Sequence, residues 1–226
     1  MELLVVTLAQ INPQREADAL ARMRVISDTI RNAPGLLNAR FYHGRAPDIC
    51  YCMLTTWESA EWWQKAQERY SPLQLLLASP EGIFHTPPDQ WLMQYLWGYS
   101  RPQAQTTVAA VHLALVRPEM AERVQQEWLE SLRQQAVEPI LSFALLARNI
   151  EEAPETPSLS TLSLAGPLQA EGTPRHSVKL GSLFFNLLSW PGEQYREDFY
   201  GNEIYQNMQG LLTRTGMLHI LTLDPL

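Results

Sequence analysis

Histidines at two positions of this chain combine a residue type and a setting that suit acid–base or metal chemistry. His112 interrupts the apolar stretch Val108–Val116, and its neighbours on the same face, Ala110 and Ala114, are small enough to leave space around an imidazole. His219 lies in the last apolar stretch of the chain. On adjacent strands the two could supply a general base, or a ligand for a metal or a haem. The alternative is a hydrogen-bonded histidine of a core or a sheet edge, and no Asp or Glu stands at a spacing that would complete a metal site.

A third histidine, His43, ends a predicted strand beside Tyr42 and close to Arg45, at the mouth of a predicted hairpin. It could hydrogen-bond a phenolic or quinone-type substrate, or it could be a solvated histidine at a loop end. The seven tryptophans could line an aromatic cavity, or they could fill a core or an oligomer interface. We take His112 and His43 as catalytic candidates. The candidates for a ligand pocket are His219, Trp57, Trp63 and Tyr42.

Motifs for several other chemistries are missing from the sequence. It contains no G-x-G-x-x-G, Walker, G-x-S-x-G or H-E-x-x-H pattern, so nucleotide-dependent, hydrolase and zincin chemistry have no support. We expect no metal and no cofactor, with haem bound by a histidine as the remaining alternative. The net charge is −7 and basic residues do not cluster, which argues against a nucleic acid or an anionic membrane as a partner. No apolar run approaches the roughly 18 residues of a membrane span.

The two cysteines, Cys50 and Cys52, stand two positions apart on one predicted strand, so both point to the same face. This spacing suits neither a disulfide nor a C-x-x-C site. We interpret them as small buried residues of a protein in the reducing cytoplasm. The N-terminal sequence MELLVVTLAQ reads as a first strand rather than a secretory signal.

Hydrophobic periodicity places the first half in the order β-α-β-β-α-β. Strands are expected at 3–11, 36–43, 49–57 and about 90–98, and helices at about 14–32 and 59–78. Asn12-Pro13 begins the first helix, Pro34-Gly35 ends it, and Ser71-Pro72 breaks or kinks the second. The second helix is expected to bury a stripe made of Trp62, Ala66, Tyr70, Leu73 and Leu77.

The same order restarts after a short linker at 99–106. Strands are expected at 108–116, 141–147, about 178–190 and 217–223, with one helix between the first two and another at about 193–213. Pro13 and Pro118 are 105 positions apart, as are Pro34 and Pro139, whereas Trp57 and its counterpart Trp190 are 133 apart. The difference matches a long irregular insertion at about 151–176. The chain therefore reads as two tandem units, 1–98 and 107–226.

Each four-stranded antiparallel sheet would carry its helices on one face and leave the other face apolar and bare. Packing the two sheets against each other covers both bare faces within one chain. We predict an α+β protein in which two ferredoxin-like βαββαβ units pack sheet-to-sheet as an intramolecular dimeric α+β barrel. This internal pseudo-dimer could assemble further into a homo-oligomer.

The run from Pro34 to Trp63 resembles the hairpin and helix of the antibiotic biosynthesis monooxygenase family, whose domains are dimeric α+β barrels. The resemblance rests on Pro34-Gly35 before the second strand and on Trp57-Glu58-Ser59 with Glu61 at the second helix, and it covers about residues 1–98. Residues 107–224 resemble the fold more weakly, because Pro191-Gly192 replace Glu58-Ser59. The family implies a pocket between the sheet and the helices of each unit.

Three functional hypotheses follow from this resemblance. The first is a cofactor-independent monooxygenase-like protein that acts on a small aromatic or quinone-type compound, with His112 or His43 as the base. The second is a non-enzymatic barrel that binds a small apolar ligand or a protein partner. The third is a haem-binding tandem barrel with His112 or His219 as the axial ligand. Haem degradation is not expected, because none of the positions that the haem-degrading branch uses holds a matching residue; they hold Thr7, Ala66, Leu76, Phe199 and Gln209.

Overall fold

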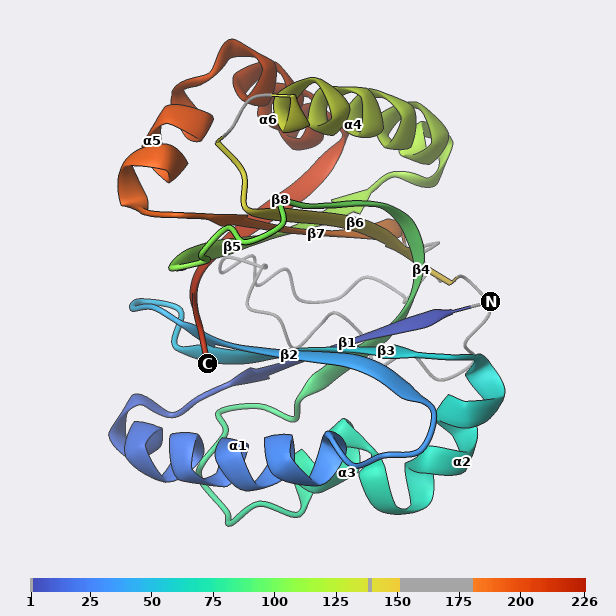
Figure 1. Cartoon of the computed structure of the whole chain (residues 1–226), viewed down its shortest axis with the longest axis vertical. Helices are drawn as coiled ribbons and strands as arrows, with labels where there is room; N and C mark the ends of the chain where they lie inside the picture. The colour runs from blue at the N-terminus through green and yellow to red at the C-terminus, as the bar shows by residue number, and fades with distance from the viewer. Residues whose placement is uncertain (1, 138–139, 151–180) are drawn as a thin grey trace, which may run out of the picture.

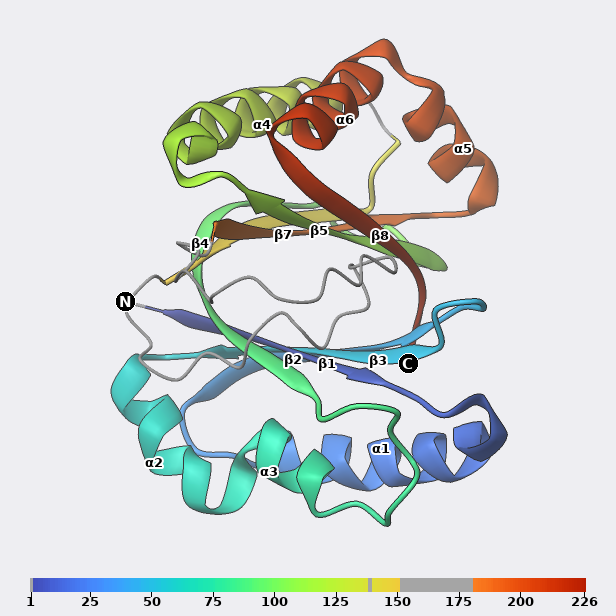
Figure 2. The ribbon, with the colours of Figure 1, turned by 180° about the vertical axis from the view of Figure 1, so that it is seen from behind.

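A computed structural model describes residues 2–137, 140–150 and 181–226 of the chain. Two sheets face each other at the centre of the molecule, and helices cover the outer face of each sheet (Figures 1 and 2). None of the described helices is long and apolar enough to cross a membrane.

The first half of the chain follows the predicted order of elements. They are β1 (Leu3–Gln10), α1 (Glu16–Ile30), β2 (Leu36–Gly44), β3 (Cys50–Trp57), α2 (Ala60–Tyr70), α3 (Pro72–Leu77) and β4 (Asp89–Ser100). A 3-10 turn, Pro13–Arg15, precedes α1 and is capped by the side chain of Asn12. The predicted break in the second helix is confirmed: the side chain of Ser71 accepts a hydrogen bond from the Gln74 backbone N–H and caps a new helix that begins at Pro72.

The predicted buried stripe of the second helix is wrong at two positions. Trp63 and Ala66 face the core, whereas Trp62 is 37% exposed and Leu77 is 52% exposed. Trp62 lies against the bare Cα of Gly35, where an added Cβ would come within 2.5 Å of the indole. The next tryptophan, Trp63, takes the core position instead.

The second half repeats the order. Its elements are β5 (Val108–Val116), α4 (Ala121–Ala136), β6 (Phe143–Asn149), β7 (Ser182–Trp190), α5 (Glu193–Gly201), α6 (Glu203–Thr215) and β8 (Gly216–Pro225). The single helix predicted at 193–213 is wrong, because Asn202 divides it and caps α6 by accepting a hydrogen bond from the Ile204 backbone N–H. The predictions for Pro139 and for the insertion at 151–176 fall outside the described residues.

The eight strands close into one barrel in the order β1-β3-β2-β8-β5-β7-β6-β4. The long strands β4 and β8 cross from one sheet to the other (Figure 2). The two seams differ in length: β4 pairs with β6 from Met93 to Ser100, whereas β2 pairs with β8 only from Tyr42 to Gly44. The predicted α+β fold, with two sheets packed as an intramolecular barrel, is confirmed.

Alternation along the strands divides the core into a barrel interior and two layers between sheet and helices. On β5, Ala109, Val111 and Leu113 point into the barrel, and Ala110 and Ala114 point toward the helices. The strands therefore look apolar on both faces because both faces are covered. Cys50 and Cys52 are unpaired thiols that both face the barrel interior, as predicted.

Candidate functional site

His112 lies on the helix-facing side of β5 and is 1% exposed. Its Nε2 is 3.0 Å from the hydroxyl of Tyr205, at the start of α6, and 3.5 Å from the hydroxyl of Tyr200, at the end of α5. Both tyrosine rings meet the imidazole edge-on. The division of the helix at Asn202 places one tyrosine on each side of the break, so both reach the same imidazole nitrogen.

Burial sets the protonation state of this cluster. Loss of solvent lowers the pKa of His112 to about 4, and the nearby backbone of Asn186 opposes this only in part. Burial also raises the pKa values of the Tyr200 and Tyr205 hydroxyls. At neutral pH the three side chains are therefore uncharged. A histidine with so low a pKa is a weak general base for a phenol but a competent hydrogen-bonding group.

Very little space remains around His112. The cavity beside it has a volume of about 10 Å³, which is about the room that one water molecule needs. Two buried polar atoms here have no hydrogen-bond partner among the described residues: Nδ1 of His112 and Oε1 of Gln135, a side chain of α4. Trp128, Phe199 and Met208 are among the large side chains of the remaining wall.

His219 does not join this cluster. It pairs with Leu113 on β5, one position beyond His112, and so points to the opposite face of the sheet, into the barrel. There it lines a cavity of about 210 Å³ at one end of the barrel, together with His85 and Asp48. The two histidines predicted to cooperate lie on adjacent strands but cannot act on one substrate, because the sheet separates them.

His43 and Tyr42 are likewise separated by alternation along β2. Tyr42 belongs to the barrel core. The Nε2 of His43 lies 3.2 Å from a carboxylate oxygen of Glu16, at the start of α1, without hydrogen-bond alignment. Arg45 pairs with Asp224 and Glu193 from the other half of the chain. The structure thus assigns the predicted hairpin-mouth residues to three different surroundings.

Trp57 and Trp63 fill the helix-facing core of the first half. Trp57 is fully buried, its ring centroid is 5.3 Å from that of Trp63, and its Nε1 donates to the hydroxyl of Thr55 at 3.0 Å. The burial, the ring contact and the hydrogen bond of this pair are typical of a packed core. Neither tryptophan lines the cavities at Arg40, His219 or His112.

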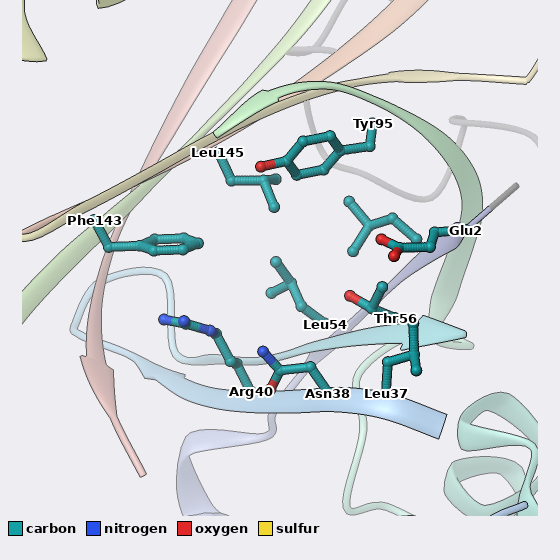
Figure 3. Close-up of a pocket in the computed structure, with 10 residues that line it drawn as sticks. Glu2, Leu37, Asn38, Arg40, Leu54, Thr56, Tyr95, Phe143 and Leu145 are labelled. Carbon is teal, nitrogen blue, oxygen red and sulfur yellow. The ribbon is translucent and has the colours of Figure 1, made fainter. Parts of the chain in front are cut away.

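A larger cavity, which we call the Arg40 cavity, lies at the end of the barrel opposite His219 (Figure 3). Its volume is about 290 Å³, and its lining residues come from the strands of both halves: Glu2, Leu4, Leu37, Asn38, Arg40, Leu54, Thr56, Tyr95, Phe143 and Leu145. The guanidinium of Arg40 lies over the ring of Phe143, 3.9 Å from its centroid. Half of these lining residues are apolar, and the charged ones are Arg40 at one side and Glu2 across the cavity near Tyr95 (Figure 3).

Sequence reasoning missed the Arg40 cavity because its residues belong to separate strands spread from residue 2 to residue 145. One signal was present: alternation places Arg40 on the same face of β2 as Tyr42, so a charged side chain faces the barrel interior. Because the neighbouring residues of this strand are mostly apolar, nothing else in the local sequence indicated a cavity at Arg40.

The described residues hold no cluster of three or more His, Cys, Asp or Glu that could bind a metal ion. Burial raises the pKa of the Cys50 thiol to about 12 and also raises that of Cys52, so both thiols stay protonated and unreactive.

No protein-family model and no curated protein matches the chain. Solved structures do match it. A candidate monooxygenase of Fusobacterium nucleatum superimposes with a TM-score of 0.71 at 8% identity, covering 100% of this chain and 92% of that one. An anthrone oxidase-like protein gives a TM-score of 0.70 at 11% identity, with 100% and 91% covered. A Listeria monocytogenes ferredoxin-fold protein related to antibiotic biosynthesis monooxygenases gives 0.52 at 9% identity, with 100% and 96% covered.

These likenesses define the class of fold. The chain folds as one intramolecular α+β barrel, and the predicted resemblance to antibiotic biosynthesis monooxygenases is confirmed for the fold. At identities of 8–11% the likenesses speak for the fold alone.

Proposed function

We propose that this protein binds a small, largely apolar molecule in the Arg40 cavity. The observation that carries the proposal is the difference in volume: the Arg40 cavity measures about 290 Å³, and the space at His112 about 10 Å³. Small-molecule sites start at roughly 300 Å³, so the Arg40 cavity suits a compound of one or two rings. Its apolar residues bury the ligand, and its polar residues fix the orientation of the ligand.

A fluorescence titration tests this proposal. N-phenyl-1-naphthylamine, a neutral two-ring dye that brightens in apolar surroundings, is expected to bind the full-length protein saturably. Leu145→Trp places an indole in the cavity and is expected to weaken dye binding at least about tenfold. The close-packed side chains around the cavity cannot move aside to accommodate both the indole and the dye. Leu37→Trp narrows the cavity at an exposed position, with less risk to folding. Leu77→Trp, on the exposed face of α3, controls for the added indole.

Unchanged dye binding in both cavity variants, with urea midpoints that show folded protein, would contradict the proposal. Loss of dye binding in the Leu77→Trp control would contradict it as well, since that residue is not part of the cavity.

A second candidate function is a cofactor-independent oxygenation at His112. The buried polar cluster favours it: the imidazole and Gln135 present unpartnered atoms between sheet and helices, where the family resemblance implies a pocket. In such a reaction the substrate supplies the electrons, as when an anthrone methylene and O₂ give a quinone carbonyl and water. A ring system enters only if the helices that cover this face of the sheet move, because the present cavity holds about one water.

Oxygen consumption with anthrone or a hydroquinone distinguishes the two functions. If the second function holds, uptake exceeds that of buffer, and His112→Gln reduces it at least about tenfold, as removal of a positioned acid–base or hydrogen-bonding group does. Uptake equal in wild type and His112→Gln would contradict it. A Soret band in the purified protein would contradict both proposals, since neither involves haem.

A further inference from the structure

Arg40 is a cation in a partly apolar cavity, and it forms no salt bridge within the part of the chain that the structure describes. Its side chain lines the cavity at a half-buried position of β2, and no carboxylate of the described residues lies within ion-pair distance of it. Arg45, on the same hairpin, instead pairs with two carboxylates. The guanidinium of Arg40 covers the ring of Phe143 at 3.9 Å, and it also lies beside the Tyr42 hydroxyl, where its hydrogen bond and charge lower the pKa of that hydroxyl against the effect of burial. Because a guanidinium carries five N–H donors, one that stacks on a ring and meets one neutral hydroxyl still has donors for another group.

The surroundings of Arg40 specify the rest of a ligand. Leu54 and Leu145 provide apolar walls that suit a flat hydrocarbon body, and Phe143 stacks beside the guanidinium (Figure 3). A carboxylate matches the fork of an arginine and forms two parallel hydrogen bonds with it. Glu2, on the other side of the cavity, would repel a second negative group. The cavity therefore suits one anionic group and not two.

We infer that the Arg40 cavity selects a small aromatic acid, with its carboxylate on the guanidinium of Arg40 and its ring between Leu54 and Leu145. The inference rests on the proposed binding function and adds the charge of the ligand to it. The second polar end of the cavity, formed by Thr56 and Tyr95, can hydrogen-bond a hydroxyl or carbonyl substituent on the ring.

Calorimetric titration with a matched pair of compounds tests the inference. 1-Naphthoate and 1-naphthalenemethanol share a ring system and differ in charge. The wild-type protein is expected to bind the acid about tenfold or more tightly than the alcohol, as a charge-assisted bidentate contact implies. Arg40→Gln is expected to remove that preference, because it weakens binding of the acid much more than binding of the alcohol. Arg40→Lys, which keeps the charge and loses the fork, is expected to retain part of it.

Arg24→Gln provides the control, because Arg24 is an exposed cation on α1, away from the cavity. It is expected to keep the full preference, which shows that net charge alone does not produce the effect. A preference that persists in Arg40→Gln, or that Arg24→Gln removes equally, would overturn the inference.

The two proposals fail in different ways. If the neutral dye binds and Leu145→Trp blocks it, but the acid and the alcohol bind equally, the binding function stands and the aromatic-acid inference falls. If neither the dye nor the acid binds, both fall.

Discussion

The helix-facing cores of the two halves share one frame and differ in polarity. In the first half, Thr7 of β1 stands opposite Met53 of β3. At the equivalent place in the second half, 105 and 133 positions later, His112 of β5 stands opposite Asn186 of β7. The hydroxyl of Thr7 in one half thus corresponds to the imidazole of His112 in the other, and the thioether of Met53 corresponds to the amide of Asn186.

The hydrogen bonding of these pairs differs as well. The Thr7 hydroxyl accepts from Nε2 of Gln90 at 3.0 Å, which satisfies the group within the sheet. The Asn186 amide donates to the backbone oxygen of Leu145 at 2.9 Å, but the Nδ1 of His112 has no partner among the described residues. An unpartnered buried polar atom costs about 1–3 kcal/mol. Because the equivalent place in the first half carries no such group, the fold does not require an unpartnered atom at this place, and the polar cluster is an addition to the frame.

The largest expected effect of this difference is on how the free energy of unfolding depends on pH. The pKa of His112 is about 4 in the folded protein against 6.5 for a free histidine, so the unfolded chain takes up the proton first as the pH falls. Stability is therefore complete above about pH 6.5 and is lost as the pH falls toward 4. The shift corresponds to about 3 kcal/mol from this single group, which urea unfolding at several pH values measures.

Two variants test whether this loss of stability at low pH comes from His112. His112→Gln keeps a hydrogen-bonding side chain without the titration, and it is expected to flatten the profile between pH 6.5 and 4. His219→Gln, on the barrel face of the same sheet, is expected to leave the loss attributed to His112 in place. Equal profiles for wild type and His112→Gln would show that the imidazole is not buried as described.

A smaller effect is expected from the two tyrosines around the imidazole. Tyr205→Phe removes the 3.0 Å partner of His112 Nε2 and is expected to cost about 1–2 kcal/mol, since it leaves this buried nitrogen with only the 3.5 Å contact to Tyr200. Tyr200→Phe removes only the 3.5 Å contact and is expected to cost less than about 0.5 kcal/mol. Urea midpoints measure both. In a His112→Leu background the two losses are expected to become equal, and a difference that persists there would place the effect elsewhere.

The frame was predictable from the sequence because it depends on local signals. Pro13 and Pro118 both open a 3-10 turn before a helix, as their spacing predicts. Alternation along Val108–Val116 correctly placed His112 beside Ala110 and Ala114. The Asn202 break was missed, because an asparagine within an amphipathic pattern reads equally well as an exposed helical residue.

The candidate sites were less predictable, because they depend on which face of which strand meets another. His112 and His219 lie on neighbouring strands as expected, yet their register differs by one residue, which sends them to opposite faces. The Arg40 cavity depends on the approach of β2 and β6, whose residues Arg40 and Phe143 lie in different halves of the chain. Periodicity within a segment says nothing about such an approach.

The smallest expected effect compares two tryptophans at equivalent positions. Trp57 and Trp190 are both fully buried, but the Nε1 of Trp57 donates to Thr55, whereas the Nε1 of Trp190 has no partner among the described residues. Replacement by Phe removes one ring and one N–H from each. The cavity cost is similar at both sites, so Trp57→Phe is expected to cost about 1 kcal/mol more than Trp190→Phe, the typical value of one hydrogen bond.

A double-mutant cycle isolates this difference from the loss of ring volume. Thr55→Val removes the acceptor, so Trp57→Phe is expected to cost about 1 kcal/mol less in that background, whereas Trp190→Phe is expected to be additive with Thr55→Val. Equal coupling of Thr55→Val to both tryptophans would mean that the hydrogen bond contributes nothing. The energetic difference between the two halves would then come from the cluster of His112, Tyr200 and Tyr205 alone. The unpartnered indole N–H of Trp190 would not affect stability.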